Sequence, residues 1–330
     1  MSRETLIALR ATIVTLVLTG LVYPLVMTGL AQVIFPWQAN GSLASDDHKV
    51  VGSTLIGQAF NGAAYFQPRP SAAGSGYDAS SSGASNFGPT SYALRDRVAR
   101  QLGPTATYAD LHNQGGLVGP DVESWFQQDR FGGKPGIVAQ WAAAHPVIAQ
   151  SWVKADPLNA DYVAAWQKTH AKEAADWIKA AGGPAEPKPE DLAVPFFASI
   201  SHDRPGTFPS IVEHKAADGK SVKTIELVNR GADIQSVFFD MWLTAHPQAG
   251  LTQVTADAVT ASASGLDPDI TLENAVEQIP RIAKARKLDP QRVRTVLDAN
   301  LEGRDLGFVG EPRVNVLQVN LALNSSFGRP

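Results

Sequence analysis

The stretch that decides the fold is residues 6–35, LIALRATIVTLVLTGLVYPLVMTGLAQVIF. Its central 21 residues, 11–31, carry no charge. At about 1.5 Å of rise per residue, a helix of that length covers the roughly 30 Å hydrocarbon core of a bilayer. The sequence therefore predicts one transmembrane helix, within an anchor of residues 1–37.

Two sequence features stand out within this predicted helix. Pro24 lies within the apolar run and predicts a kink. Small residues recur three and four positions apart, at Ala8, Thr12, Thr15 and Thr19. Such a strip on one helix face favours packing against a second membrane helix. A plain lipid-facing anchor is the alternative interpretation of the same spacing.

The flanking charges predict the orientation. Arg3 and Arg10 precede or open the apolar run, whereas the first basic residue after it is Lys49. By the positive-inside rule we expect a single-pass membrane protein with a cytoplasmic N-terminus and an external soluble part, which in a cell inner membrane is the periplasmic side. A cleaved signal peptide is the rival, with Ser42 and Ala44 as a small-residue cleavage pattern, but its apolar run would span only about 7–15 residues.

Composition limits the class of protein further. The 330 residues leave room, beyond the anchor, for one large or two small domains. The net charge is −4 and no Lys/Arg-rich run occurs, which argues against nucleic acid as a partner. The chain has no cysteine, so disulfides, thiol catalysis and thiolate metal sites are excluded.

The segments after the anchor alternate between ordered and irregular patterns. Leu55, Ile56 and Phe60 around Gly57 predict a short strand within residues 51–66, ending in an Asn61-Gly62 turn. Residues 67–91 have the Gly/Ser/Pro composition of a linker, although their aromatic and acidic residues exceed what a flexible tether needs. Residues 91–102 predict an amphipathic helix.

Six short motifs in this order resemble one family. They are GSTLIGQAF (52–60), YFQPRPS (65–71), SNFGPT (85–90), TASASGLDP (260–268), QIPRIAKAR (278–286) and GFVGEPRVNV (307–316). Together with the single N-terminal span, they are similar to the C subunit of the Kdp-type potassium-transporting P-type ATPase. The resemblance covers about residues 1–112 and 251–330.

The resemblance and the segment patterns together predict an α+β fold, with one N-terminal transmembrane helix and a soluble core of residues 38–112 and 251–330, into which a mostly helical module is inserted. It implies an accessory subunit of a high-affinity, ATP-driven potassium import complex. Such a subunit joins a potassium-translocating A subunit, an ATP-hydrolysing B subunit and a small F subunit, and stabilises their assembly. It has no catalytic residue, metal or intrinsic cofactor of its own.

The same family is described as a catalytic chaperone that raises the affinity for ATP, which this chain would meet only through the complex. That role conflicts with the predicted topology, because cytoplasmic ATP lies opposite the soluble part. We prefer the topology and assign no residue to ATP. A membrane-anchored external enzyme is the alternative function, against which the absence of nucleophile and metal patterns speaks.

Residues 113–250 depart from the shorter family members, which join the flanking blocks almost directly. This insert carries six of the seven tryptophans. It contains an internal repeat of 25 residues, VAQW-x3-H-x6-WV (138–153) and VAAW-x3-H-x6-WI (163–178), which predicts a small helical bundle. A GGPAEPKPE linker (182–190), a hairpin over 210–228 turned at Asp218-Gly219, and a helix over 233–246 follow. We expect a separately folded, removable module whose two ends meet in space.

The insert also holds the patterns that most resemble sites. A Trp-x3-His pairing occurs three times, at Trp141/His145, Trp166/His170 and Trp242/His246. Three histidines on helix faces are a candidate metal site, but stacking of each Trp on a His one turn later is the favoured interpretation. Gly219-Lys220-Ser221 lacks the first glycine of a phosphate-binding loop, since His214 stands at that position.

Two helices are predicted near the C-terminus, over 271–287 and 289–301. Thr271 and Asp289 are their expected caps, and Leu272, Val276, Ile279 and Ala283 share a face of the first helix, which contains Pro280. Gly303 is expected to end the second. Residues 314–323, VNVLQVNLAL, are apolar on both faces and favour a buried strand, with a helix as the close alternative.

Overall fold

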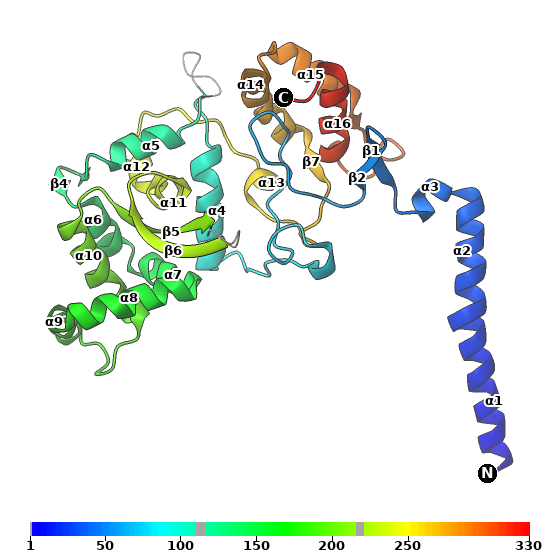
Figure 1. Ribbon diagram of the computed structural model, residues 1–330, viewed down its shortest axis with the longest axis horizontal. Helices are drawn as coiled ribbons and strands as arrows, with labels where there is room; N and C mark the ends of the chain where they lie inside the picture. The colour runs from blue at the N-terminus through cyan, green and yellow to red at the C-terminus, as the bar shows by residue number, and fades with distance from the viewer. Residues whose placement is uncertain (1, 110–115, 216–220) are drawn as a thin grey trace. The chain divides into compact units, whose positions relative to one another are not determined.

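The computed structural model describes residues 2–109, 116–215 and 221–330. It confirms an α+β chain that begins with one long apolar helix (Figure 1). The chain forms two compact units: unit 1 comprises Met1–Ala84 and Ala261–Pro330, and unit 2 comprises Ser85–Thr260. The predicted turn at Asp218-Gly219 and the predicted module boundary at residues 112–113 lie outside the described residues.

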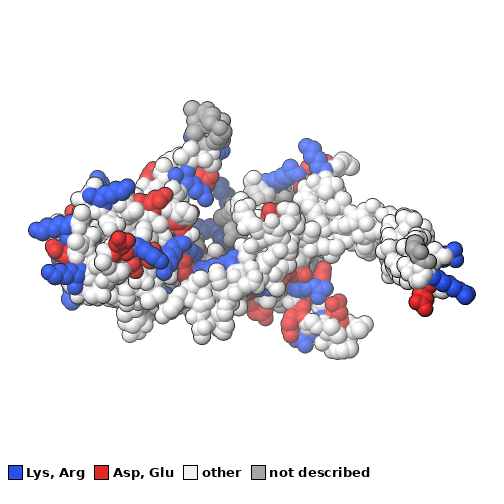
Figure 2. Space-filling model, turned by 90° about the horizontal axis from the view of Figure 1, so that it is seen from below, with Lys and Arg blue, Asp and Glu red and all other residues white. Residues whose placement is uncertain are grey.

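The anchor is one rod made of α1 (Arg3–Val17), a π-helical turn (Leu18–Val22) and α2 (Tyr23–Ile34), followed by the short α3 (Pro36–Ala39). Pro24 has no N–H to donate to the preceding turn. The backbone widens just before it, so that the Tyr23 N–H bonds the Leu18 carbonyl. The expected disturbance at Pro24 thus takes the form of a π turn. Viewed from below, the rod is seen nearly end-on from its N-terminal end, and charged side chains appear in colour beside that end (Figure 2).

Unit 1 continues from the anchor with an antiparallel hairpin of β1 (Leu43–Asp46) and β2 (Lys49–Ser53). Asp47 and His48 form its turn with φ of 48° and 64°. The strand predicted around Gly57 is therefore wrong beyond Ser53, and residues 54–66 form no strand. The physical reason is that the backbone beyond Gly57 bonds to distant loops and side chains instead of to a neighbouring strand.

A three-stranded antiparallel sheet and three helices complete unit 1. The strand order is β7–β9–β8, with β7 Asp269–Thr271, β9 Arg313–Asn315 and β8 Leu301–Glu302. The helices are α14 (Leu272–Arg286), α15 (Pro290–Ala299) and α16 (Val316–Phe327). The apolar core lies between them and includes Phe66, Ile270, Ile279, Ile282, Val293, Leu297, Val314, Val319 and Leu323. Every residue of this core belongs to unit 1.

The caps of the C-terminal helices match the prediction, whereas two other expectations fail. Thr271 accepts from the Asn274 N–H, and Asp289 from the Gln291 N–H. The second helix ends at Ala299, before Gly303, because the chain enters β8. The strand favoured over 314–323 is wrong beyond Asn315, since α16 begins at Val316. The apolar residues on both faces of this segment suggested a buried strand. In the structure they lie on a helix that is packed on most sides.

Unit 2 is mostly helical, as expected of the insert. Its helices are α4 (Tyr92–Thr105), α5 (Gly119–Phe126), α6 (Ile137–Ala144), α7 (Pro146–Ala155), α8 (Pro157–Thr169), α9 (Ala171–Ala181), α10 (Ala193–Asp203), α11 (Ala232–Val237), α12 (Phe239–Ala245) and α13 (Ala256–Val259). The hairpin of β5 (Phe208–Lys215) and β6 (Ser221–Val228) is confirmed, and a small one joins β3 (Arg130–Phe131) to β4 (Lys134–Pro135). Short 3₁₀ turns occur at Pro189–Leu192 here and at Ala79–Ser81 in unit 1.

Both copies of the repeat form a helix, a break at the histidine and a second helix. His145 separates α6 from α7, and His170 separates α8 from α9. An aromatic core joins these helices to the β5–β6 hairpin, with Trp141, Phe197, Phe208 and Phe238 almost fully buried. The helix predicted over 233–246 is present but breaks at Phe238.

The ends of the insert meet inside unit 2. The Ala109 N–H bonds the Gly250 carbonyl at 3.0 Å, and the Thr252 N–H bonds the Thr107 carbonyl at 2.9 Å. The compact unit nevertheless begins at Ser85, because α4 packs on α11. A Cβ on Gly103 of α4 would lie 2.5 Å from the Gln235 backbone, so only glycine allows this approach. The helix of residues 91–102, predicted to belong to the flanking core, therefore lies in unit 2.

Candidate functional site

The candidate site lies in unit 1, where side chains of α14 and α16 hold the backbone of residues 62–67. The amide of Asn320 accepts from the Phe66 N–H at 2.8 Å and donates to the Phe66 carbonyl at 2.9 Å. Gln278 does the same for Gln67, at 2.7 and 3.1 Å. Each amide thus makes the two bonds that a neighbouring strand would make. Phe66 is fully buried between them.

Two arginines of α14 complete this ladder. Arg281 donates to the carbonyls of Ala63 at 2.8 Å and Tyr65 at 3.1 Å. Arg286 donates to the Ala64 carbonyl at 2.7 Å and lies over the Tyr65 ring, 5.0 Å from its centre. Burial lowers the pKa of Arg281 to about 10, since neutral carbonyls replace part of its hydration. We call this arrangement the side-chain ladder.

The apparent linker of residues 67–91 begins with an ordered loop built around Ser71. Its hydroxyl donates to the Gly265 carbonyl at 2.6 Å and accepts from the Tyr77 N–H at 2.8 Å. The Tyr77 hydroxyl donates to the Arg69 carbonyl at 2.5 Å, and burial raises the pKa of Tyr77 to about 12. Composition alone indicates a linker here. The loop is instead ordered, because its short polar residues form hydrogen bonds between loops.

Motif glycines allow the loops to approach this closely. Gly265 has φ of 67°, and a Cβ there would lie 2.6 Å from the Ala73 nitrogen. Gly57 donates its N–H to the Leu266 carbonyl at 2.7 Å, and a Cβ on it would lie 2.4 Å from the Asp267 carbonyl oxygen. Both glycines are required by close backbone contact between segments about 200 residues apart in sequence.

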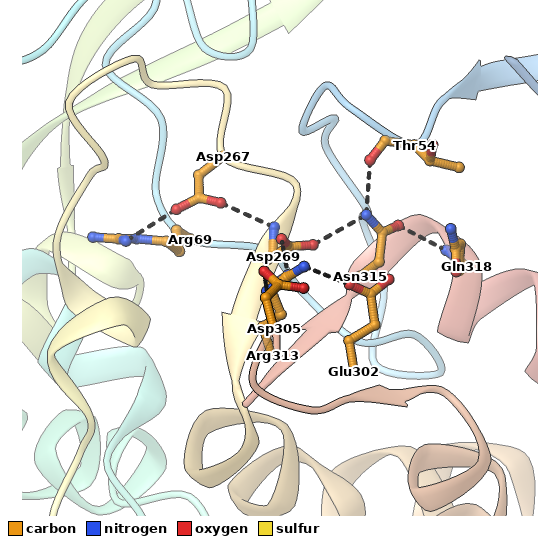
Figure 3. A network of polar contacts seen from close by, with 9 residues as sticks. All are labelled: Thr54, Arg69, Asp267, Asp269, Glu302, Asp305, Arg313, Asn315 and Gln318. Carbon is orange, nitrogen blue, oxygen red and sulfur yellow. Dashed lines mark hydrogen bonds and ion pairs between the residues drawn. The ribbon is translucent and has the colours of Figure 1, made fainter. Parts of the chain in front are cut away.

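A charged network adjoins these loops (Figure 3). Arg313 of β9 contacts Glu302 at 3.0 Å, Asp269 at 3.4 Å and Asp305 at 3.6 Å. Arg69 pairs with Asp267 at 3.1 Å. The pKa of Asp269 is raised, mainly by burial and also by its carboxylate neighbours, against the lowering effect of the hydrogen bond from Asn315. Two guanidinium groups therefore face four carboxylates.

Asn315 links this network to its surroundings. Its amide donates to the Thr54 carbonyl at 2.8 Å and to Asp269 at 3.1 Å, and its oxygen accepts from the Gln318 N–H at 3.2 Å (Figure 3). One side chain thus caps α16, ties the sheet to the hairpin end and contacts the charged network. The whole arrangement is suited to fixing loop positions.

The predicted partner-packing residues lie elsewhere, on the anchor. Ala8, Thr12 and Thr15 are on α1 and Thr19 is in the π turn, and all four are exposed. The Thr12 hydroxyl donates to the Ala8 carbonyl at 2.9 Å, and the Thr19 hydroxyl donates to the Thr15 carbonyl at 2.8 Å. Because these hydroxyls are satisfied within the helix, the strip presents small, largely apolar groups. Its packing against a partner helix stays a prediction.

Two of the three Trp–His pairs stack as expected. The Trp166 and His170 rings lie 5.2 Å apart at 14°, and the Trp242 and His246 rings lie 4.7 Å apart at 22°. Trp141 packs instead edge-on against Phe197 at 5.0 Å. Over residues 2–109, 116–215 and 221–330, no three His, Asp or Glu side chains are grouped so that they could hold a metal ion.

The side-chain ladder was missed from sequence. Gln278, Arg281 and Arg286 lie in a quoted motif, but no role was given to them. Asn320 is one of three amides in the apolar run of residues 314–323, and this was the one signal available, because a buried amide needs partners.

Comparisons with known proteins agree with the resemblance. The family model for the K⁺-transporting ATPase c chain, KdpC, matches residues 5–117 and 226–325. A "Potassium-transporting ATPase KdpC subunit" of Myxococcus xanthus is 33% identical over 324 residues, which cover 98% of this chain and 88% of that protein. Those of Acidobacterium capsulatum (33%, 95% and 93% covered) and Koribacter versatilis (29%, 100% and 98% covered) are similar over comparable lengths.

These matches also bear on the insert. The part that the family model leaves unmatched, residues 118–225, lies wholly within unit 2. The relatives align over nearly the full chain, so they carry a segment of similar length there. The family-matched part of unit 2 includes α4, α11 and α12.

Proposed function

Since the chain belongs to the KdpC family of K⁺-transporting ATPase c chains, we propose that it stabilises the assembly of the potassium-translocating A subunit, the ATP-hydrolysing B subunit and the small F subunit. One observation carries this proposal: the family motifs build interlocked loops on a single membrane-spanning helix. The polar groups of the side-chain ladder and of Ser71 hydrogen-bond to backbone atoms and so fix the positions of the loops. A rigid binding surface needs such an arrangement.

We propose that the chain lies in the inner membrane, with the N-terminus in the cytoplasm and residues 38–330, beyond the anchor, on the periplasmic side. The basic residues of the anchor, Arg3 and Arg10, support this orientation. Protease added outside cells with a permeabilised outer membrane should then digest the part of the chain beyond the anchor. Protection in that experiment, together with digestion in inverted vesicles, would show that the orientation is the opposite of the one proposed.

We also propose that the chain acts as a chaperone that raises the affinity of the complex for ATP. It can do so only indirectly, through the other subunits. In this topology residues 38–330, beyond the anchor, lie on the periplasmic side and cannot touch ATP. Any change in ATP affinity must therefore pass through contacts with the A, B or F subunit, made by the anchor or by the external part of the chain. ATP therefore belongs to the complex and not to this chain.

Deletion and complementation test the function. Cells lacking this chain should fail to grow at low potassium, and membranes from them should yield A and B subunits that separate on purification. The full chain should restore both. Normal growth at low potassium without the chain would overturn the proposal and leave the anchored external enzyme as the alternative.

A further inference from the structure

The loop between β8 and β9 displays two large apolar side chains to solvent. Leu306 is 86% exposed and Phe308 is 74% exposed, the highest values among large apolar residues of the described chain outside the anchor. The adjacent Val309 is 46% exposed. We call residues 306–309 the apolar tip.

The tip is held rigidly at its base. Asp305 and Val309 exchange both backbone hydrogen bonds, at 2.9 and 2.8 Å. Arg304 pairs with Glu311 at 2.6 Å across the loop. Arg313 of β9 contacts Asp305 from the sheet at 3.6 Å. The exposed side chains therefore project from a defined turn.

The backbone of the tip is unfavourable for the residue it carries. Leu306 has φ of 54° and Gly307 has φ of 81°. Left-handed backbone suits glycine or asparagine, and a leucine there is destabilised by contact of its Cβ with the backbone. Leucine at this position therefore destabilises the fold in two ways: its backbone conformation is unfavourable, and its apolar side chain is exposed to water. Strain combined with exposed apolar surface is typical of a binding position.

The charges around the tip select between the surfaces it could meet. Glu302, Asp305 and Glu311 outnumber Arg304 and Arg313, and the side chains of Glu311 and Asp305 are the most exposed of the five at 76% and 68%. Anionic lipid headgroups attract Lys and Arg, so this rim does not suit them. It suits a protein surface with positive charge around an apolar pocket.

We propose that the apolar tip inserts Leu306 and Phe308 into an apolar pocket with a basic rim on the external face of the A subunit. The inference rests on the proposed function, because that function supplies a membrane partner on the same side. A large aliphatic and an aromatic side chain presented together have the composition of an interface centre. The charged base of the loop then forms the rim of the contact.

A substitution pair tests the tip without unfolding it. Leu306→Asn removes the apolar side chain and places a residue that tolerates positive φ, so the turn should keep its shape. Combined with Phe308→Ser, it should weaken the retention of this chain on the purified complex by about tenfold or more. Val222→Ser on β6 is the matched control, because Val222 is apolar and 48% exposed. Its retention should equal that of the unchanged chain.

Two outcomes separate this inference from the proposed function. If the unchanged chain does not co-purify with the A and B subunits, the proposed function fails. If it does, and the double variant is retained equally well while its melting temperature shows it folded, only the role of the tip fails.

A photo-reactive phenylalanine analogue at position 308, in the full chain in its own membrane, identifies the surface directly. Its expected product is a cross-link to the A subunit, absent when the analogue stands at position 222. Cross-linking at 308 only to lipid, or to the other subunits, would overturn the proposal.

Discussion

At the scale of single residues, Asn315 explains why strand and helix were confused near the C-terminus. Its side chain caps α16, so the strand β9 ends and the helix begins at one point in an otherwise apolar run. An Asn followed three residues later by Gln318 has the pattern of a helix start. Apolar periodicity over 314–323 does not reveal this helix start, and the structure shows it through the Asn315 cap.

The glycine contacts give a prediction on stability. Gly265→Ala should lower the free energy of unfolding of unit 1 by about 2 kcal/mol or more, since the new Cβ meets backbone atoms at a positive φ. Gly303→Ala is the control, because a Cβ there has no atom within 4 Å. Thermal unfolding of the purified chain measures both. Equal melting temperatures would show that the loops can move apart without cost.

Tyr77 gives a prediction on pH. Its pKa is raised from the ordinary tyrosine value of 10.0 to about 12 in the folded chain, so the folded state retains the phenolic proton when the unfolded state has lost it. Its contribution to stability is complete below pH 10.0 and is lost as pH rises toward about 12. Tyr77→Phe should remove this alkaline decline and also cost about 1 kcal/mol at neutral pH through the lost hydrogen bond. Denaturant unfolding at several pH values would test it, and an unchanged slope in the variant would contradict it.

At the scale of elements, the anchor and the repeat helices follow local pattern closely. The repeat predicted two helical units, and the structure adds that each breaks at its histidine. The π turn before Pro24 follows from one missing donor. The strand expected around Gly57 failed because its backbone partners are distant in sequence: Gly57 bonds the Leu266 carbonyl, and residues 62–67 bond side chains of α14 and α16.

The exposed strip on α1 gives the prediction at this scale. Thr15→Leu should weaken co-purification of the A and B subunits, since a larger side chain prevents close helix approach. Val17→Leu is the control, because at about 3.6 residues per turn it lies on the opposite face of the helix. Equal recovery with both variants would favour the plain lipid-facing anchor.

At the scale of the whole molecule, the two units have separate cores. Unit 1 also closes on itself, because the Gly83 N–H bonds the Ser264 carbonyl at 2.9 Å, next to both places where the chain leaves the unit. Joining Ala84 to Ala261 should therefore leave unit 1 folded in the membrane and able to bind its partners. Protease resistance and co-purification would measure this. An aggregated product would show that unit 1 needs unit 2.

The deletion suggested by the sequence, His112 joined to Leu251, should be less well tolerated than first expected. Its ends do meet, since Ala109 and Gly250 are hydrogen-bonded. However, α4 would remain without α11, which contacts it at Gly103 and pairs Asp233 with Arg100. We expect this variant to be more protease-sensitive over residues 85–112 than the Ala84–Ala261 junction.

Local chemistry along the chain was enough to identify the long apolar helix that could span a membrane, the capped helices, the repeat and the family motifs. Each depends on residues within a few turns of one another, where period and capping operate. Tertiary structure alone assigned residues 62–67 to a side-chain ladder, α4 to unit 2, and Leu306 and Phe308 to an exposed tip. The ladder pairs residues 254 and 211 positions apart, Phe66 with Asn320 and Gln67 with Gln278. Contacts between residues so far apart produce no periodic pattern in the sequence, because they depend on how the loops fold back onto the helices.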